Sequence, residues 1–301
     1  MAPKITVGIP AYNEEAGIAR SVKSALSSHP APTEVIVVAS GCTDNTEGVV
    51  RELMRKDRRV KLIVEKKRAG KGSAINLILK NAKGDFLIMT DADLFFSPNS
   101  IAELLRRFTP KIGAVSGRPE YYAASPMFKW WGRFASECAS SQRIAREKSG
   151  YHAISGYLYA LRRGIVDGIM PSAKSEDAYV GEVVRQKGYA IGYAPRAIVN
   201  VGYAENYRDY LMQKVRTHYG HLEVFKKAGA GDVLQTAQMS LGLRGAFREY
   251  FKVANELIKT PTEYGYFLFF IFTEFAVWFM AFLKFYLKGS EEWKQIRSTK
   301  K

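Results

Sequence analysis

The stretch that decides the fold runs from Phe86 to Asp93 and reads FLIMTDAD. Its first four residues form an apolar run that is typical of a strand buried on both faces. Asp91 and Asp93 follow at once, separated by one residue, and two carboxylates this close repel each other unless a cation lies between them. Because Mg²⁺ or Mn²⁺ can bridge protein carboxylates to substrate phosphates, we interpret the pair as a metal site. The alternative is a helix-capping Asp93 and a solvated Asp91.

The segments on both sides of this stretch alternate between strand and helix patterns. Strands are expected at 5–9, 34–38, 60–65, 86–89, from 113 onward, 154–161 and 190–201, and helices at 14–28, 43–56, 71–81, 97–107, 126–147, 177–187 and 206–227. Repeated strand–helix–strand units predict an α/β fold with a parallel sheet and helices on both of its faces. In such sheets, ligands bind at the carboxyl ends of the strands.

Three further polar segments fall where this sheet places its ligand. PAYNEE at 10–15 follows the first strand, SGCTDNT at 40–46 follows the second, and KKRAGKGS at 66–73 precedes a helix. The glycines of the last segment let backbone N–H groups approach an anion, and its cations neutralise that anion. Its spacing is neither that of a Walker loop nor that of a dinucleotide-binding loop. A fourth segment, Ser175-Glu176-Asp177, by itself indicates only a helix start.

The composition favours anionic partners and excludes some classes. The chain carries 45 Lys and Arg against 29 Asp and Glu, a net charge of +16. Residues 51–83 hold 12 basic and 3 acidic residues, a local +9 that we interpret as a solvated face. No nucleic-acid-binding motif accompanies it, so we expect no nucleic-acid partner. Cys42 and Cys138 are too few for a disulfide framework, and we expect a reducing, cytosolic compartment.

The C-terminal region is strongly apolar. Residues 264–287 contain twelve aromatic residues and are long enough to span a bilayer. Glu274 lies near the middle, where an ionised carboxylate is costly, and basic residues flank both ends. We therefore expect an interfacial or re-entrant helical hairpin on the cytoplasmic leaflet, built from residues 233–287. The alternative is a soluble subdomain or a dimer interface. An aromatic segment at 128–131 is expected to be exposed at the start of a helix. For its two tryptophans we prefer core packing to the alternative that they line the entry of a lipid acceptor.

The order of these clusters is more specific than any one of them. PAYNEE, SGCTDNT, RAGKGSAIN, TDAD, SGYLYALRRG, SED and QKVRTH, spread over residues 4–221, resemble the inverting glycosyltransferases of family 2, which have the GT-A fold. The resemblance implies an α/β fold with a mixed, mostly parallel sheet between helices, here followed by a C-terminal helical membrane-associating extension. The PAYNEE and TDAD segments are also similar to those of polyprenol-phosphate mannosyltransferases. The resemblance implies a nucleotide-diphosphate-sugar donor, a Mn²⁺ or Mg²⁺ cofactor, and transfer by a single displacement.

The resemblance also implies a role for each matching residue. It makes Asp177 the catalytic base, Asp93 the metal ligand, and Asp91 a contact of the ribose and donor sugar, with Asp91 as a second candidate metal ligand. His218 lies on the helix expected at 206–227, where it is either a ligand of phosphate or metal or a structural histidine. It places Glu176, Gln213 and Arg216 on the acceptor and diphosphate side. The residues that it implies bind the donor are Pro10, Ala11, Tyr12, Glu14, Ser40, Arg68, Lys71, Asp91, Ala92 and Asp93.

Departures from the family pattern narrow the expected substrate. Ser40 stands where many members have the carboxylate that reads the base, which leaves guanine open, and Arg68 stands where Asn is common. Thr217 replaces the Trp of processive synthases, which argues against polysaccharide extrusion. We expect a single mannose to move from GDP-mannose to a lipid-type acceptor, with UDP-glucose or a UDP-N-acetylhexosamine as the next donors. Alternatives are a polyprenyl-phosphate acceptor and a non-catalytic membrane scaffold. The expected divisions are a catalytic domain at 1–205, an acceptor-side helix and linker at 206–230, and a membrane-associating region at 231–301.

Overall fold

The computed structural model describes residues 3–146, 154–171, 175–228 and 243–287. The chain divides into two compact units. The first comprises Met1–Glu120 and Arg143–Val201, and the second comprises Tyr121–Gln142 and Gly202–Thr299. The end of the expected linker, at 229–230, and the first residues of the expected hairpin, 233–242, lie outside the described residues.

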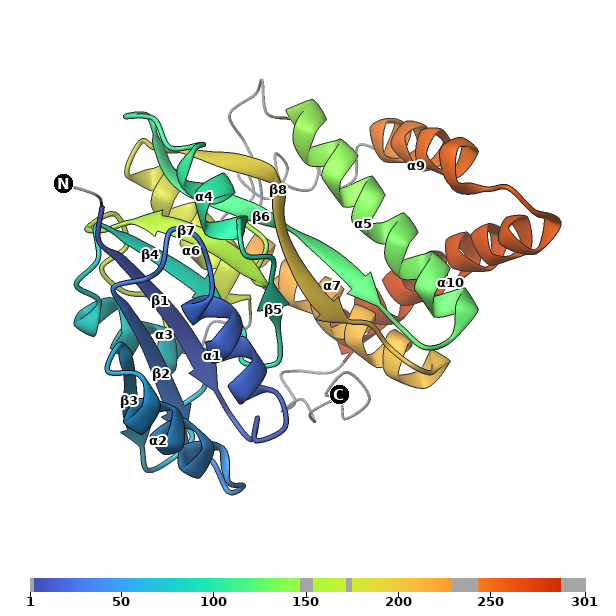
Figure 1. Ribbon diagram of the computed structural model, residues 1–301. Coiled ribbons are helices and arrows are strands. Elements are labelled where there is room, and N and C mark those ends of the chain that lie inside the picture. The colour runs from blue at the N-terminus through green and yellow to red at the C-terminus, as the bar shows by residue number, and fades with distance from the viewer. Residues whose placement is uncertain (1–2, 147–153, 172–174, 229–242, 288–301) are drawn as a thin grey trace. The chain divides into compact units, whose positions relative to one another are not determined.

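An eight-stranded sheet forms the centre of the first unit (Figure 1). Its strands are β1 (Ile5–Ala11), β2 (Glu34–Ser40), β3 (Val60–Glu65), β4 (Phe86–Thr90), β5 (Phe95–Phe96), β6 (Ile112–Tyr122), β7 (Leu158–Arg162) and β8 (Ala190–Gly202). Their order is β3-β2-β1-β4-β7-β6-β8-β5. The first four are parallel, whereas β7 is antiparallel to both β4 and β6, and β5 is antiparallel to β8. The sheet is mixed, as predicted, with its parallel half at the N-terminus.

Helices cover both faces of the parallel half of the sheet. They are α1 (Ile18–Leu26), α2 (Thr46–Lys56) and α3 (Lys71–Asn81), joined later by α4 (Ser100–Leu105) and α6 (Glu176–Gln186). All residues of β2 are buried, so both of its faces are covered. Its Ile36 and Val38 pack in one core cluster with residues of α3 and α6. The chain moves outward from β1 to β3 and then back to β4, and right-handed crossovers therefore put α1 and α2 on the opposite face from α3.

Element boundaries differ from the sequence prediction where polar loops meet the sheet. β1 extends through Pro10 to Ala11, because both residues pair with β2. The pairing of β1 with β4 ends earlier, at Gly8. α1 begins at Ile18 rather than at residue 14, since the intervening residues form a turn that contacts the loop after β2. The two-residue β5 was not predicted; it pairs only with β8 and has no pattern of its own.

The second unit is built from helices with an aromatic core. Its helices are α5 (Pro126–Arg146, of which the residues to Gln142 belong to this unit), α7 (Tyr207–Ala228), α9 (Leu243–Leu257) and α10 (Pro261–Leu287). Trp131 is fully buried and donates its indole N–H to the Tyr266 carbonyl at 2.9 Å. Phe128 and Trp130 are also buried. The expectation of an exposed aromatic start was therefore wrong, and core packing is the role of these rings.

The helix α10 has one buried and one exposed face, and both are mainly apolar. Thr273, Val277 and Ala281 are fully buried, at a spacing of four residues that marks one side of a helix. Phe272, Phe275 and Phe279 lie on another side and expose 67%, 59% and 65% of their surface. α10 is the one helix in the described part of the chain that is long and apolar enough to cross a membrane. It is continuous from Pro261 to Leu287, and its first turns pack on α9 through Phe267 and Phe270.

Candidate functional site

The order of the strands reverses direction next to β1. The chain passes from β1 to β2 on one side and, after β3, crosses to β4 on the other side. In open α/β sheets, ligands bind outside the carboxyl ends of the strands at such a reversal. The loops after β1 and β4 meet here, and they carry the PAYNEE and TDAD segments.

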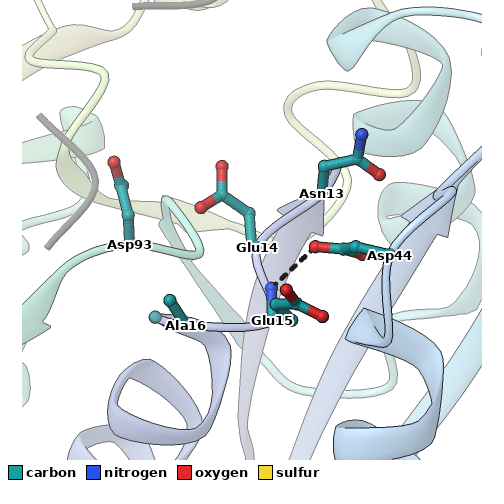
Figure 2. A pocket seen from close by; sticks show the side chains of 7 residues that line it. Asn13, Glu14, Glu15, Ala16, Asp44 and Asp93 are labelled. Carbon is teal, nitrogen blue, oxygen red and sulfur yellow. Dashed lines mark hydrogen bonds between the residues drawn. The ribbon is translucent and has the colours of Figure 1, made fainter. Parts of the chain in front are cut away.

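A pocket opens at this point (Figure 2). It is lined by residues of the loops after β1, β2 and β4, namely Asn13, Glu14, Glu15, Ala16, Gly17, Asp44 and Asp93. The side chains of Glu14 and Asp93 point in the same direction within it. A Cβ atom on Gly17 would lie 3.0 Å from the Asp93 Cα atom, and Ser21 donates to the Asp91 carbonyl at 3.1 Å. The start of α1 therefore fixes the backbone of the Asp91–Asp93 turn.

Hydrogen bonds join the loops after β1 and β2. Asn13 adopts a left-handed backbone with φ 52° and accepts the Thr43 N–H through its side chain at 2.8 Å. The Glu15 N–H donates to Asp44 at 3.0 Å, the bond drawn in Figure 2. Burial tends to raise the pKa of Asp44, but the donors on Thr46 and Glu15 outweigh it and lower that pKa. Asp44 is therefore an ionised part of the pocket wall.

The two carboxylates of the TDAD segment have different surroundings. Lys71, the first residue of α3, places its Nζ atom 2.6 Å from Asp91 Oδ1. The cation next to Asp91 is thus Lys71 itself. The sequence analysis instead expected the cations of the 66–73 loop, Lys71 among them, to neutralise a bound anion. Asp93 faces the pocket.

The fit of a divalent metal rests on these oxygen donors. Among residues 3–146, 154–171, 175–228 and 243–287, no group of three or more His, Cys, Asp or Glu side chains is arranged to hold a metal ion. Mg²⁺ is commonly held by one or two carboxylates together with substrate phosphates rather than by a complete protein cage. Asp93, aimed into an oxygen-rich pocket, fits the protein's share of such a site.

Asp177 lies in the first turn of α6 and is held by three hydrogen bonds. Its Oδ1 atom accepts from the Ser175 hydroxyl at 3.0 Å and from the Ala178 N–H at 2.9 Å, and its Oδ2 atom accepts from the Gly156 N–H at 3.0 Å. Gly156 immediately precedes Tyr157, whose carbonyl accepts from Thr90 at the end of β4. The antiparallel pairing of β7 with β4 therefore brings Asp177 beside the strand that carries the two aspartates.

Lys71 electrostatically connects these acidic groups. Burial tends to lower the pKa of Lys71, but Asp91, Glu176 and Asp177 together raise it above its usual value. Burial likewise raises the pKa of Glu176, and Lys71 only partly offsets this effect. Asp91 is thus in contact with the Lys71 ammonium, and the charges of Glu176 and of the predicted base, Asp177, also act on it.

Tyr12 and Arg68 meet at the carboxyl end of the parallel strands. The Arg68 guanidinium lies 4.0 Å from the centre of the Tyr12 ring, a cation–π contact. Ser40 is buried and accepts the Ala69 N–H at 3.4 Å, so its hydroxyl supports the loop that carries Arg68. A Cβ atom on Gly41, which has φ +62°, would lie 2.3 Å from the backbone nitrogen of Arg68. Ala11 is buried in β1 with Pro10, and Ala92 is buried between the two aspartates.

The remaining predicted residues belong to the second unit. Gln213 and Arg216 lie on α7, where the Gln213 carbonyl accepts from the Thr217 hydroxyl at 3.0 Å. His218 stacks edge-on against Trp278 at 4.3 Å, and its Nε2 atom lies 3.8 Å from Glu274.

Sequence reasoning missed Gly17, Gly156 and Tyr159. Gly17 is needed because a side chain there would press on the Asp93 backbone. Gly156 donates its N–H to the predicted base, Asp177. Tyr159 is buried where the charges of Lys71 and Asp177 act on it. The position of Gly17 just before α1 is the one signal that could have suggested a close approach.

Solved structures share this architecture. A mannosyltransferase from Pyrobaculum calidifontis, solved with GDP-Man and Mn²⁺, superposes with a TM-score of 0.70 at 20% identity, covering 96% of this chain and 89% of that one. Residues 1–349 of TarS from S. aureus, solved with UDP, give a TM-score of 0.50 at 15% identity, covering 98% and 95%. GalNAc-T7, solved with UDP, GalNAc and Mn²⁺, gives 0.53 at 15% identity over 67% and 43%. These likenesses confirm the expected fold class, and with it the GT-A architecture.

Sequence relatives point to the same group of enzymes. A poly-β-1,6-N-acetyl-D-glucosamine synthase of Staphylococcus aureus is 25% identical over 230 residues, which are 73% of this chain and 55% of the relative. The enzyme of that name from Staphylococcus epidermidis is 25% identical over 240 residues, 76% and 57% of the two chains. The chain thus spans about half the length of the curated relatives that it matches. The profile of glycosyl transferase family 2 matches residues 6–170, more than half of the chain, and the protein belongs to that family.

Proposed function

We propose that the protein is an inverting, metal-dependent transferase that moves one sugar from a nucleotide diphosphate to a lipid-type acceptor. One observation carries this proposal. The Asp91–Asp93 turn and the Asp177 carboxylate come from distant parts of the sequence, yet Lys71 links their charges at the carboxyl end of the parallel strands. A diphosphate-binding turn and a base for an incoming hydroxyl are the two parts that a single displacement requires.

The proposed reaction uses these groups in a simple way. Asp177 takes the proton of the acceptor hydroxyl, whose oxygen forms a new bond to the anomeric carbon as the bond from that carbon to the diphosphate breaks. Attack opposite the leaving group inverts the anomeric centre, and no carboxylate nucleophile is required. The hydrogen bonds from Ser175, Ala178 and Gly156 orient the Asp177 carboxylate. Asp93 would hold a divalent metal, which would supply stabilisation of the negative charge on the departing diphosphate.

The donor proposed first is GDP-mannose. Arg68 presents a guanidinium above Tyr12 at the strand ends, and an Arg fork matches the O6 and N7 acceptors of guanine. The similar archaeal structure is that of a mannosyltransferase bound to GDP-Man. The curated relatives instead make a polymer of N-acetylglucosamine, which favours an N-acetylhexosamine donor as the second candidate.

The proposed acceptor is a lipid because of α10. Its exposed aromatic side chains make a lipid-facing surface that extends along the helix, while its polar residues turn toward α7. We propose that α9 and α10, within residues 233–287, attach the protein to the cytoplasmic face of the membrane, and that 1–205, 206–230 and 231–301 act as catalytic, acceptor-side and membrane-associating regions. Gln213 and Arg216 are proposed to act on the acceptor and diphosphate side.

A transfer assay tests the proposal. Purified protein in detergent is incubated with GDP-mannose or a UDP-sugar, a lipid extract, and Mn²⁺, Mg²⁺ or EDTA. The labelled lipid is then extracted and identified by mass spectrometry. We expect one donor to label lipid only with metal, and both Asp93→Ala and Asp177→Asn to abolish labelling. Donor binding should survive in Asp177→Asn.

Other outcomes select the alternatives. Full labelling by Asp177→Asn would favour a polyprenyl-phosphate acceptor, whose phosphate oxygen needs no strong base. The absence of nucleotide binding under every metal condition would overturn the enzyme proposal in favour of a membrane scaffold.

A further inference from the structure

Residues 155–157, which lie directly before β7, are hydrogen-bonded to side chains from three different elements. The N–H of the first residue donates to the Ser116 hydroxyl of β6 at 2.9 Å. The N–H of the second, Gly156, donates to Asp177 Oδ2 of α6 at 3.0 Å. The carbonyl of the third accepts from the Thr90 hydroxyl of β4 at 3.0 Å. The 155–157 segment therefore connects the end of β4, where the TDAD turn begins, with the predicted base.

Two side-chain hydroxyls extend the ladders by which β7 joins the sheet. The pairing of β7 with β4 begins at Leu158, opposite Thr90, and its pairing with β6 begins at Tyr159, opposite Ser116. Thr90 and Ser116 expose only 1% and 0% of their surface, and their hydroxyls bind the backbone groups that come next along the chain. Because buried backbone groups are costly without partners, these two bonds attach the 155–157 segment to the sheet in one position.

The 155–157 segment in turn limits where the Asp177 carboxylate can lie. The Oδ1 atom is held from the start of its own helix by Ser175 and Ala178, whereas the Oδ2 atom is held from outside that helix by Gly156. A Cβ atom on Gly156 would lie 3.1 Å from Oδ2, so the segment passes directly beside the carboxylate. A shift of the segment therefore changes the position of the carboxylate oxygen that α6 does not hold.

We propose that Thr90 and Ser116 are positioning residues of the base, which act on Asp177 through the 155–157 segment. This inference rests on the proposed function, in which Asp177 takes the proton of the acceptor hydroxyl. Thr90 directly precedes Asp91, so one residue supports both the donor-side turn and the base. A general base must lie within hydrogen-bond reach of its proton, and a displacement of about 1 Å can cost about 100-fold in rate.

The kinetics of sugar transfer test this inference, with the full-length protein in detergent and the donor that wild type uses. Thr90→Val removes the hydroxyl and keeps the shape of the side chain, whereas Thr90→Ser keeps the hydroxyl. We expect Thr90→Val to lower kcat about tenfold with an unchanged KM for the donor, and Thr90→Ser to restore most of the wild-type kcat. Ser116→Ala, which removes the other contact, should act in the same direction.

Two further variants separate positioning from stability. Ser100→Ala is the matched control, because Ser100 is fully buried and its hydroxyl donates to the Ile198 carbonyl of β8 at 2.8 Å. This variant also loses a buried hydroxyl and should keep the wild-type kcat, whatever its melting temperature. Gly156→Ala presses on the Asp177 carboxylate and leaves β4 unaltered. It should reproduce the loss of kcat at an unchanged KM for the donor.

Each outcome has a defined meaning. An unchanged kcat in Thr90→Val and Ser116→Ala overturns the positioning role, and so does a loss of kcat that Ser100→Ala shares. A KM for the donor that rises as kcat falls in Thr90→Val also overturns it, because the effect then lies in the donor-side turn. In these cases the proposed function stands, since wild type transfers sugar; no transfer by wild type with any donor overturns both. Should Thr90→Val not fold, Ser116→Ala and Gly156→Ala decide by the same comparison.

Discussion

The Tyr210 hydroxyl donates to Glu274 Oε1 at 2.7 Å, which joins α7 to the middle of α10. Lys214 Nζ lies 3.8 Å from the same carboxylate, and Tyr207 and Thr273 share a hydrogen bond at 3.2 Å one turn away. The acidic residue that looks costly inside an apolar run is thus paired with a neighbouring helix. α10 can therefore present an apolar face outward while its one central carboxylate stays satisfied.

Removing this pairing should destabilise the second unit. Glu274→Ala leaves the Lys214 ammonium and the Tyr210 hydroxyl without their acceptor, and we expect a loss of about 2 kcal/mol in the free energy of unfolding. Urea unfolding in detergent, followed by tryptophan fluorescence, measures it. Glu256→Gln on the exposed side of α9 serves as the control and should change little. Equal stability of the two variants would show that the Glu274 contacts contribute nothing.

The exposed face of α10 should bind lipid. Phe272→Ser combined with Phe279→Ser removes two side chains that expose 67% and 65% of their surface, so the fold should be kept while apolar area for the bilayer is lost. We expect co-sedimentation with phosphatidylcholine–phosphatidylglycerol vesicles to fall several-fold, with an unchanged melting temperature. Ile144→Ser, at an exposed apolar residue of α5, is the control. Undiminished vesicle binding by the double variant would contradict a lipid-facing α10.

Gly41 should be essential for the donor loop. Gly41→Ala adds a Cβ atom 2.3 Å from the backbone nitrogen of Arg68. Gly188 also has a positive φ, but the Cβ atom that Gly188→Ala adds would have no neighbouring atom within 4 Å. Both substitutions carry the backbone cost of a left-handed residue, about 1 kcal/mol. Isothermal titration should find nucleotide affinity reduced at least about tenfold in Gly41→Ala alone, because only that variant displaces Arg68. Equal nucleotide affinities of the two variants would show that the Arg68 loop does not contribute to donor binding.

Acid should remove the contribution of Glu34 to stability. Burial tends to raise the pKa of this carboxyl, but Lys61, Thr6 and the Lys83 N–H outweigh it and lower the pKa. A lowered folded pKa means that the stabilisation is present above the unfolded value near 4.3 and is lost as the pH falls through the folded value.

We therefore expect Glu34→Gln to cost about 2 kcal/mol at pH 7, and progressively less as the pH falls from about 4.3 through the lowered folded value. Chemical unfolding across that range measures the difference. Glu52→Gln, on an exposed face of α2, is the reference. A difference between Glu34→Gln and wild type that is independent of pH would contradict the assigned cause.

The parallel half of the sheet could be predicted because its signals are local. The apolar runs before PAYNEE, SGCTDNT and TDAD each end at polar residues, and these positions became β1, β2 and β4. The antiparallel return of β7 beside β4 could not be predicted, since nothing in residues 158–162 specifies a partner some 70 positions earlier. Short elements such as β5 depend on pairing alone and have no pattern.

The sequence proposes members of the candidate site but does not predict their contacts. Asp91, Asp93 and Asp177 were identified from the sequence, whereas the cation beside Asp91 is Lys71, which the loop pattern assigned to an external anion. The packing partner of Trp131 and the pairing of Glu274 could not be predicted for the same reason. Both depend on α10 packing against helices more than 60 residues away, and amphipathic patterns do not reveal which helices will meet.

A thermal-shift measurement tests the central claim most directly. Wild type and Asp93→Ala are heated with GDP, UDP, CDP or ADP, each with Mn²⁺, Mg²⁺ or EDTA, because a ligand that binds only the folded state raises the melting temperature. The account predicts a rise with one nucleotide, GDP before UDP, that requires metal and disappears in Asp93→Ala. An unchanged melting temperature with every nucleotide and metal would contradict it.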